Sequence, residues 1–322
     1  MSLEVIKPGL FSVFQDLGRH GAQKLGVPAS GAMDELAHRL ANLAVGNAEN
    51  EATLEIMLMG PTLRFNRPAT IALAGADLGA TLNEQPLALL APIAVPAGAV
   101  LQFAKRKTGL RAYLAVAGGF GLPSLLGSTS TYVRGGFGGF QGRALRKGDV
   151  LNLPCRAERA ALPPASAAAL RLLRSLAQPD AAEPLRLVTG REWKYFSVVA
   201  QKLLLSTGYR VGPQSDRMGY RLEGPPLERA CTGDILSSAV AFGTMQVPPN
   251  GMPIVLMADR QASGGYPRIA QVASVDLPRL AQVMPGETVH FSLISLNQAE
   301  ELLLERGRTL GALREALDIK WK

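Results

Sequence analysis

Short runs in which apolar and polar residues alternate dominate this chain and predict a protein built mainly from strands. Between residues 53 and 153, glycine, proline and asparagine turns separate the runs at short intervals. This spacing is typical of antiparallel sheets or barrels, and not of strands that alternate with helices. A glycine turn followed by alternating apolar residues recurs at Val95–Phe103, Leu145–Leu153 and Val283–Phe291, which indicates related β units.

A few stretches carry the spacing of amphipathic helices. Ser30 or Asp34 can cap the first of these helices, and a second is expected around Phe196–Leu205. A last helix is predicted to begin at Asn297, with Glu300 as its capping-box partner. The predicted fold class is therefore mainly β with a few helices.

The two halves of the chain begin in a similar way, which suggests a duplication. LEVIKPGLFSVFQD followed by LGRHGAQKLGVP resembles LRLVTGREWKYF followed later by SDRMGYRLEGPP. We expect two domains, at residues 1–155 and 185–322, joined by an alanine- and proline-rich linker at 156–184. A chain of 322 residues with 47% hydrophobic and 19% charged residues can bury the core that two domains need.

The stretch QVPPNGMPIVLMADRQASGGYPRI is the first candidate site. Its apolar run Ile254–Ala258 predicts a strand that ends in a polar, glycine-containing loop. Asp259, Gln261 and Tyr266 lie in that loop and Gln246 opens the stretch, a composition suited to binding a polar ligand at the end of a rigid element. A hairpin turn with a surface ion pair explains the same residues equally well.

The second candidate is a glycine-rich segment, Val116–Arg143, with nine glycines. Its backbone N–H groups, above all near Gly135 and Gly136, could cradle a carboxylate or phosphate between Arg134 and Arg143. Glycines that only permit bends and close packing are the alternative.

The third candidate is the loop GPQSDRMGYRLEG. Asp216 could accept a proton or orient Arg217 toward an anion, with Ser215 beside them. An Asx turn with a surface ion pair is the alternative. Near the N-terminus, Asp16, Arg19 and His20 form a similar cluster, in which His20 could act as a base or be purely structural.

The composition narrows the partners. The net charge is +8, but the basic residues are scattered and aromatic residues make up only 6%, so we expect small anionic substrates and no nucleic acid. No apolar run is long enough to cross a bilayer and no secretory signal opens the chain, so we expect a cytoplasmic protein without membrane contact. Two distant cysteines and three histidines predict neither a disulfide framework nor a metal site.

Several catalytic signatures are absent from the sequence. It contains no Walker A loop, no HExxH and no GxSxG, so ATP would need an atypical site. No lysine lies in a Met-Lys-Met context, so the chain is not expected to carry covalent biotin.

The motifs QDLGRHG, GVPASGAMD, LGSTSTYVRGGFGG, GRALRKGD, SDRMGYRLEG and QVPPNGMPIVLMADRQASGGYPRI resemble the biotin-dependent carboxyltransferase-like family. That family includes the C subunit of prokaryotic ATP-dependent 5-oxoprolinase, the Kip antagonist and proteins of the allophanate hydrolase subunit 2 type. The matching segments extend from about Gln15 to Phe291. Agreement over that length is more specific than any single motif.

The resemblance implies two cyclophilin-like β-barrel domains in tandem. It implies a C subunit that works with two partners, an A subunit plus a Kip inhibitor-like B subunit. The implied reaction opens 5-oxo-L-proline to L-glutamate with ATP as cosubstrate. In such a scheme Arg134, Arg143 and the glycine amides would bind the anion, while Gln246, Asp259, Gln261 and Tyr266 would position the substrate.

Two other functions are compatible with the same resemblance. One is a carboxyltransferase component that accepts a carboxyl group from a biotin carrier on another chain, of the urea or allophanate type. The other is a regulator that binds a kinase-inhibitor protein and performs no chemistry. Neighbouring reading frames and an assay with 5-oxoproline would separate the three.

Overall fold

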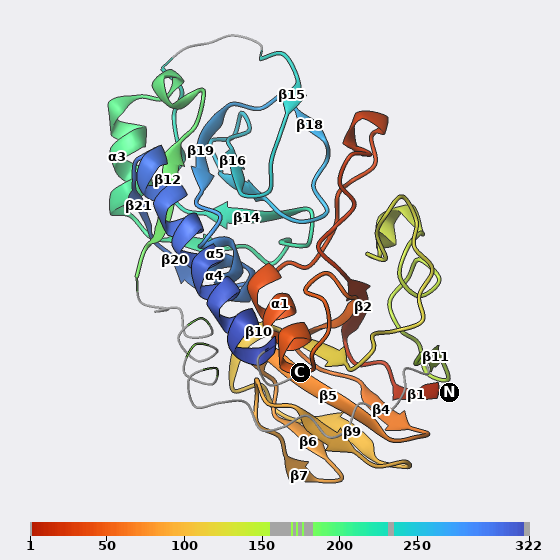
Figure 1. Cartoon of the computed structure of the whole chain (residues 1–322). Coiled ribbons are helices and arrows are strands. Elements are labelled where there is room, and N and C mark those ends of the chain that lie inside the picture. The colour runs from red at the N-terminus through yellow and green to blue at the C-terminus, as the bar shows by residue number, and fades with distance from the viewer. Residues whose placement is uncertain are drawn as a thin grey trace. The chain divides into compact units, whose positions relative to one another are not determined.

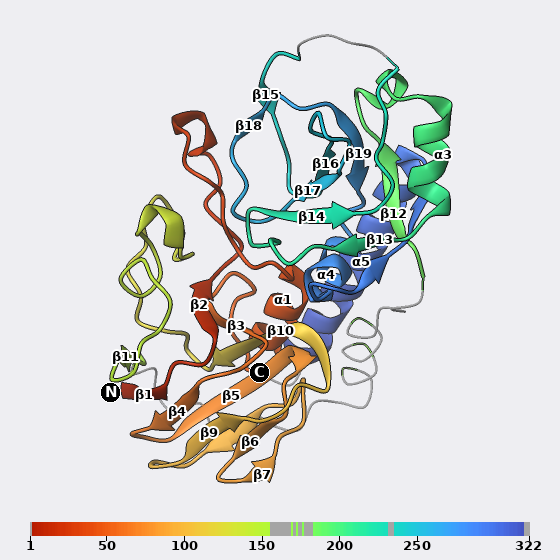
Figure 2. The same ribbon diagram turned by 180° about the vertical axis from the view of Figure 1, so that it is seen from behind.

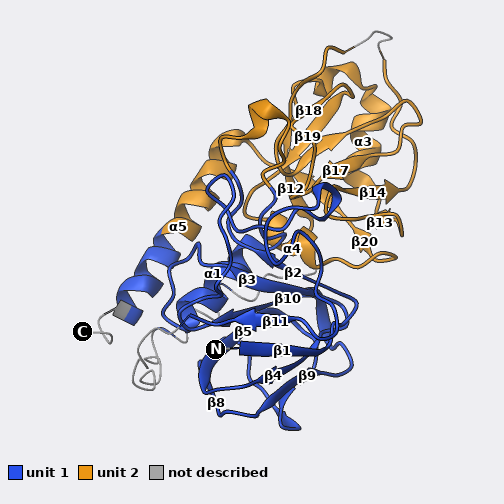
Figure 3. Ribbon diagram, turned by 90° about the vertical axis from the view of Figure 1, so that its right-hand side faces the viewer, with its two compact units in different colours: residues 1–19, 30–179, 308–322 blue, residues 20–29, 180–307 orange. Residues whose placement is uncertain are grey.

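The computed structural model describes residues 2–154, 169, 172, 176, 183–230 and 235–318 (Figure 1). Strands outnumber helices within these residues, which confirms the mainly β class. The chain divides into two compact units (Figure 3). Unit 1 comprises residues 1–19, 30–179 and 308–322, and unit 2 comprises residues 20–29 and 180–307. Most of the predicted linker at 156–184, and both cysteines, lie outside the described residues.

Unit 1 contains two antiparallel sheets, which form two layers in Figure 2. The six-stranded sheet has the order β11 (Val150–Asn152), β1 (Ser2–Lys7), β4 (Thr62–Phe65), β9 (Val100–Phe103), β6 (Ala80–Leu82) and β7 (Gln85–Pro86). The five-stranded sheet has the order β2 (Phe11–Gln15), β3 (Thr53–Met57), β10 (Thr108–Val116), β5 (Ala69–Asp77) and β8 (Ile93–Val95).

From Ile71 to Ala74, successive side chains of β5 alternate between two cores. Ile71 and Leu73 belong to the core shared by the two sheets, whereas Ala72 and Ala74 belong to a second cluster with helix α1. Because successive side chains on a strand point to opposite faces, one apolar strand serves both clusters. The small alanines allow the helix to lie close to the sheet.

Helix α1 (Glu35–Ala44) forms where the sequence predicts it. Asp34 is its N-cap, and its Oδ1 accepts a hydrogen bond of 2.8 Å from the Ala37 N–H. This bond satisfies one of the backbone donors that a helix start leaves without a partner. Of the two capping residues considered, Asp34 is the one the fold uses.

Unit 2 is organised by an eight-stranded sheet that curls into a nearly closed barrel. Its edge strands, β20 and β21, are separated along the chain by His290 alone, so the two edges of the sheet return to the same place. The order is β20 (Thr288–Val289), β13 (Tyr209–Val211), β14 (Gly219–Glu223), β17 (Ile254–Leu256), β16 (Thr244–Gln246), β19 (Arg268–Val272), β12 (Leu185–Thr189) and β21 (Phe291–Leu293). A separate pair joins β15 (Ser238–Ala239) to β18 (Ser263–Gly264).

The remaining helices are short, except the last. Helix α3 (Val198–Ser206) confirms the second predicted helix, with Ser197 as its N-cap. The described helices further include η1 (Gln23–Leu25), η2 (Val133–Gly135), η3 (Trp193–Tyr195), α4 (Leu277–Gln282) and α5 (Leu296–Asp318), which begins in unit 2 and ends in unit 1.

The predicted start of the last helix was wrong by one residue and its predicted cap by two. The Ser295 Oγ accepts from the Gln298 N–H at 3.2 Å, and the Gln298 Oε1 accepts from the Ser295 N–H at 2.9 Å. A serine and a glutamine three residues apart therefore form the capping box in place of Asn297 and Glu300.

The three recurring glycine turns share one backbone conformation. Gly98, Gly148 and Gly286 have φ of 80°, 84° and 94°, and a strand follows each of them. Glycine adopts this left-handed conformation without the steric cost that other residues incur. The repeated sequence pattern thus encodes a repeated turn.

Within the residues that the structure describes, none of the helices has both the length and the apolar character that crossing a bilayer requires.

Candidate functional site

Arg217 and Asp259 form a buried, bidentate ion pair in unit 2. The Arg217 Nε lies 2.9 Å from Asp259 Oδ2, and its Nη2 lies 3.1 Å from Oδ1. The two residues are only 8% and 6% exposed. Two parallel N–H···O bonds fix both the distance and the orientation of the two groups. The structure therefore joins residues that the sequence placed in separate candidate sites.

Neighbouring strands hold this pair in place. Strands β14 and β17 are antiparallel, and hydrogen bonding continues past the ladder into the two loops. The Asp259 N–H donates to the Arg217 carbonyl at 2.7 Å, and the Met257 N–H donates to the Met218 carbonyl at 3.0 Å. Side-chain and backbone bonds thus link the loop before β14 to the loop after β17.

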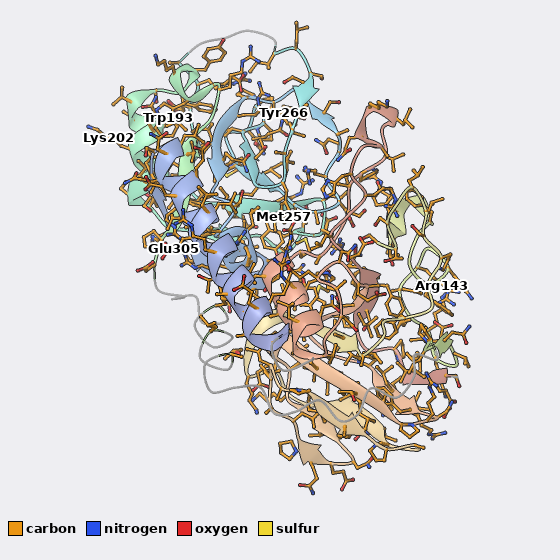
Figure 4. The ribbon with its side chains drawn as sticks, in the orientation of Figure 1. Arg143, Trp193, Lys202, Met257, Tyr266 and Glu305 are labelled. Atoms are coloured by element: carbon orange, nitrogen blue, oxygen red, sulfur yellow. The ribbon has the colours of Figure 1, made fainter. Side chains whose placement is uncertain are left out.

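Gln246 lies close to the loop that carries Tyr266. Its side chain is buried, and its Nε2 donates to the Tyr266 carbonyl at 3.4 Å. A methyl group at Gly264 would lie 2.3 Å from that nitrogen, so a larger residue there would displace the amide. Tyr266, labelled in Figure 4, lies near β15 and β18. Its side chain is 46% exposed, and Gln261 is exposed as well.

Ser215 and Asp216 make local turn bonds. The Asp216 Oδ1 accepts from the N–H groups of Met218 and Gly219 at 2.8 and 3.2 Å. The Ser215 Oγ accepts from the Arg221 N–H at 3.0 Å. This is the geometry of an Asx turn, the alternative that the sequence left open for this loop. The Asp216 side chain is exposed, and a role in ligand binding stays a prediction.

In unit 1 the glycine-rich segment turns tightly around η2. Arg134 is exposed on this short helix, and Gly136 follows with φ of 68°. A methyl group at Gly135 would lie 2.6 Å from a ring carbon of Tyr132. Close packing and a left-handed backbone therefore both require glycine here, and the exposed backbone next to Arg134 stays a candidate anion site.

Arg143 is engaged by an internal carboxylate. Its Nη1 and Nη2 lie 2.7 and 2.8 Å from the two Asp149 oxygens, and Nη2 also donates to the Gln141 Oε1 at 2.7 Å. The hydrogen bonds from Arg143 hold the pKa of the Asp149 carboxyl below its usual value, so this carboxylate is ionised at neutral pH. An anion bound by Arg143 would compete with Asp149.

The structure reveals a hub at Asp16 that the sequence did not predict. This buried carboxylate accepts from the hydroxyls of Ser128 and Ser130 at 2.7 and 2.5 Å, and from the N–H of Thr129 at 2.6 Å. Burial raises the pKa of Asp16, but the hydrogen bonds from Ser130, Ser128 and the backbone N–H groups of Thr129 and Gly18 together outweigh burial and leave this pKa below its usual value.

Arg19 supports the same segment from the other side. It is fully buried, its Nε donates to the Leu125 carbonyl at 3.0 Å, and its Nη2 donates to the Ser130 carbonyl at 2.9 Å. A methyl group at Gly138 would lie 2.0 Å from that Ser130 carbonyl oxygen. Asp16 and Arg19 therefore anchor residues 125–130, the middle of the glycine-rich segment.

A second buried polar network lies beneath α1. The Tyr113 hydroxyl donates to Glu55 Oε2 at 2.8 Å, and the same hydroxyl accepts from the Asp34 N–H at 2.8 Å. Burial and the charge of Glu55 raise the pKa of Tyr113 well above its usual value, so the phenol stays protonated and can donate. Burial also lowers the pKa of His38 to about 4, so that imidazole is neutral at physiological pH.

The predicted residues thus form two groups. Arg134, Gly135, Gly136 and Arg143 belong to unit 1, where Asp16 and Arg19 support their loop. The others belong to unit 2, where they lie in the loop before β14, at the end of β16, in the loop after β17 and in the loop before β19: Ser215, Asp216, Arg217, Gln246, Asp259, Gln261 and Tyr266.

Comparison with known proteins identifies the class. The model of the family "Carboxyltransferase domain, subdomain A and B" matches residues 25–293. The chain is similar to the 5-oxoprolinase C subunit of Haemophilus influenzae, with 38% identity over 96% of both chains. It is also similar to that of Escherichia coli, with 37% identity over 92% of this chain and 93% of the relative. The protein therefore belongs to the carboxyltransferase domain family, which confirms the resemblance seen in the sequence.

A solved structure supports the same family. The crystal structure of the Kluyveromyces lactis urea amidolyase superimposes with a TM-score of 0.87 at 30% identity. It matches 97% of this chain but only 20% of that much longer protein. The fold described above is thus one segment of a larger enzyme in that relative.

Proposed function

We propose that this protein is the C subunit of an ATP-dependent 5-oxoprolinase, which opens 5-oxo-L-proline to L-glutamate. The observation that carries the proposal is identity of 37–38% to two such C subunits along almost the whole of both chains. Similarity over the full length of a relative supports a shared role better than similarity to a fifth of a multidomain enzyme.

The relatives are named as C subunits, which implies a complex of several chains. We propose the A and B subunits of such an enzyme as partners of this protein. ATP is then a cosubstrate of the complex. The lactam is a stable amide, and phosphorylation of its oxygen by ATP would make the ring carbon reactive enough for water to add. Collapse of that adduct would break the C–N bond to give an acyl phosphate, whose hydrolysis yields glutamate and phosphate. The developing charge on the phosphoryl group needs cationic and N–H donors, which both candidate loops of this chain offer.

We assign roles to the candidate residues on their geometry. Arg134, with the amides of Gly135 and Gly136, is the anion-binding element, because the Arg134 side chain is exposed beside a glycine turn. The Gly136 N–H donates to the Val133 carbonyl at 3.1 Å, so it would bind an anion only by sharing or releasing that bond. Arg143 contributes to this element only through a ligand that displaces or shares Asp149. The proposed substrate-positioning groups are Gln246, Asp259, Gln261 and Tyr266, with Ser215, Asp216 and Arg217 shaping the loop beside them.

We further propose that the two units are cyclophilin-like barrels that correspond mainly to the expected domains 1–155 and 185–322, although residues 20–29 belong to unit 2 and residues 308–322 to unit 1. The nearly closed sheet of unit 2 and the two facing sheets of unit 1 support this proposal. Three glycine turns with the same backbone conformation, two in unit 1 and one in unit 2, support a common origin for the units.

A carboxyltransferase component is the second candidate function. The similarity to urea amidolyase at a TM-score of 0.87 favours it, because that enzyme contains the same fold. In this case the chain would accept a carboxyl group from a biotin carrier on another chain, with no biotin attached to its own lysines.

One reconstitution separates the two functions. The chain is purified together with the products of neighbouring genes that encode its proposed partners, and glutamate release from 5-oxo-L-proline is measured with and without ATP. The oxoprolinase proposal predicts release that requires ATP and every protein of the complex. Transfer of carboxyl from biotin to urea, without glutamate release, would overturn it in favour of the second function.

A further inference from the structure

Unit 1 contains a pocket of about 520 Å³ at the C-terminal end of α1, apart from the candidate residues described above. Pockets of roughly 300–1,000 Å³ are typical of sites for small molecules. The walls come from α1, from the loop that follows it, and from the last turns of α5, whose unit 1 part lies beside α1 in Figure 3. Three charged side chains contribute to its lining: Arg39, Glu49 and Arg314.

Two arginines and one glutamate meet in this pocket. Arg39 Nη1 lies 2.7 Å from Glu49 Oε2, and Arg314 Nη1 lies 3.4 Å from Glu49 Oε1. Two cations therefore share one carboxylate, and the cluster has an excess positive charge. A guanidinium has five N–H donors, and among the described contacts each arginine uses one of them here. The remaining donors can bind carboxylate oxygens in bidentate fashion.

Apolar side chains complete the pocket. Leu17, Leu43 and Leu317 line it together with the charged groups. Aliphatic side chains favour contact with methylene groups, which lose unfavourable contact with water there. The ligand that fits best is therefore a short aliphatic chain with two anionic ends.

We propose that this pocket binds an amino dicarboxylate, and that L-glutamate is its ligand. The two guanidinium groups would bind the two carboxylates, and Glu49 would accept hydrogen bonds from the ammonium group. Each charge of the ligand then meets an opposite charge. The choice of glutamate rests on the proposed function, of which it is the product. Leu17 directly follows Asp16, so a ligand here would also contact the segment that anchors the glycine-rich loop.

Isothermal titration calorimetry on the purified chain tests this proposal, with L-glutamate and glutarate as probes. Glutarate keeps both carboxylates but lacks the ammonium group. The native chain is expected to bind glutamate at one site and more tightly than glutarate. Arg314→Ala should weaken glutamate binding at least about tenfold, the amount that loss of a charged hydrogen bond implies. Glu49→Gln should abolish the preference for glutamate over glutarate.

Arg64→Ala is the matched control, because Arg64 also lies in unit 1 at 3.4 Å from a glutamate, Glu4, but outside the pocket. Its affinity for glutamate should equal that of the native chain. Absence of saturable binding at millimolar glutamate, equal affinity for the two probes in the native chain, or equal binding by Arg314→Ala and Arg64→Ala would each overturn the proposal.

This test is independent of the assay for the proposed function. A chain that binds glutamate in a complex inactive on 5-oxoproline would retain the pocket and refute the function. An active complex in which this chain fails to bind glutamate would do the reverse.

Discussion

Arg217 and Asp259 are 42 residues apart in the sequence and form a two-pronged ion pair at 2.9 and 3.1 Å. Both side chains are buried, so the attraction between them is little screened by solvent. The pair connects the loop before β14 to the loop after β17. Two motifs that read as independent candidate sites are therefore parts of one rigid element.

Replacing Asp259 by asparagine should destabilise the chain by about 3–5 kcal/mol, because the buried Arg217 charge would lose its partner. Urea unfolding followed by circular dichroism measures the change. The double variant Arg217→Met/Asp259→Leu removes both charges and should cost less than Asp259→Asn alone. A loss below about 0.5 kcal/mol for Asp259→Asn would show that the pair does not hold the loops.

Arg134→Ala should lower the turnover of the reconstituted complex at least about tenfold, because one cation next to the developing charge is removed. The exposed position predicts an unchanged free energy of unfolding. Arg146→Ala is the matched control, an exposed arginine of the same unit outside the glycine-rich turn, and should retain full turnover. Equal turnover for the two variants would remove Arg134 from the site.

Gly264→Ala should raise the KM for 5-oxoproline about tenfold, because the added methyl group would displace the Gln246 amide, 2.3 Å away. Steady-state kinetics measures this change. Gly307→Ala provides the contrast, since a methyl group there meets no atom within 4 Å and lies in helix α5. That control should leave KM unchanged and stabilise the helix by roughly 0.5–1 kcal/mol. An unaltered KM for Gly264→Ala would contradict the positioning role of Gln246.

Stability should fall as pH drops from about 6.5 toward 4, in part because of His38. Its pKa is about 4 in the folded chain and 6.5 in a model compound, so the unfolded state binds the proton first. The neutral imidazole therefore stabilises the fold fully above pH 6.5, the pKa of the unfolded state. This stabilisation is lost as the pH falls from 6.5 to about 4, the pKa of the folded state. The full loss is about 3 kcal/mol.

Unfolding of native and His38→Asn chains across this pH range checks the assignment. The variant should show a shallower dependence between pH 6.5 and 4. Parallel curves for the two chains would exclude His38 as the source.

Local pattern predicted much of the fold. The glycine turns before β9, β11 and β20 are determined by neighbouring residues, so the sequence reveals them directly, and it named Asp34 as one of two possible caps of α1. The cap of α5 was misplaced because two overlapping patterns, at Ser295 and at Asn297, compete within the same few residues. Propensity alone does not choose between them.

The candidate sites were less accessible to sequence reasoning. Asp16 was noted as part of a polar cluster, yet its hydroxyl partners lie 112 and 114 residues away, and no spacing rule links them. The same limit concealed the pairing of Arg217 with Asp259. Residue type showed where polar groups gather, whereas tertiary contacts determine which of them already have an internal partner.

As the C subunit of a 5-oxoprolinase, this chain should be essential to the reaction. The most direct measurement is ATP-dependent glutamate release by the mixture of purified proteins of the complex, with this chain present or omitted. We expect glutamate release in the complete mixture. This release should stop when the chain is omitted and return when the chain is added back. Equal glutamate release with and without the chain would contradict the account.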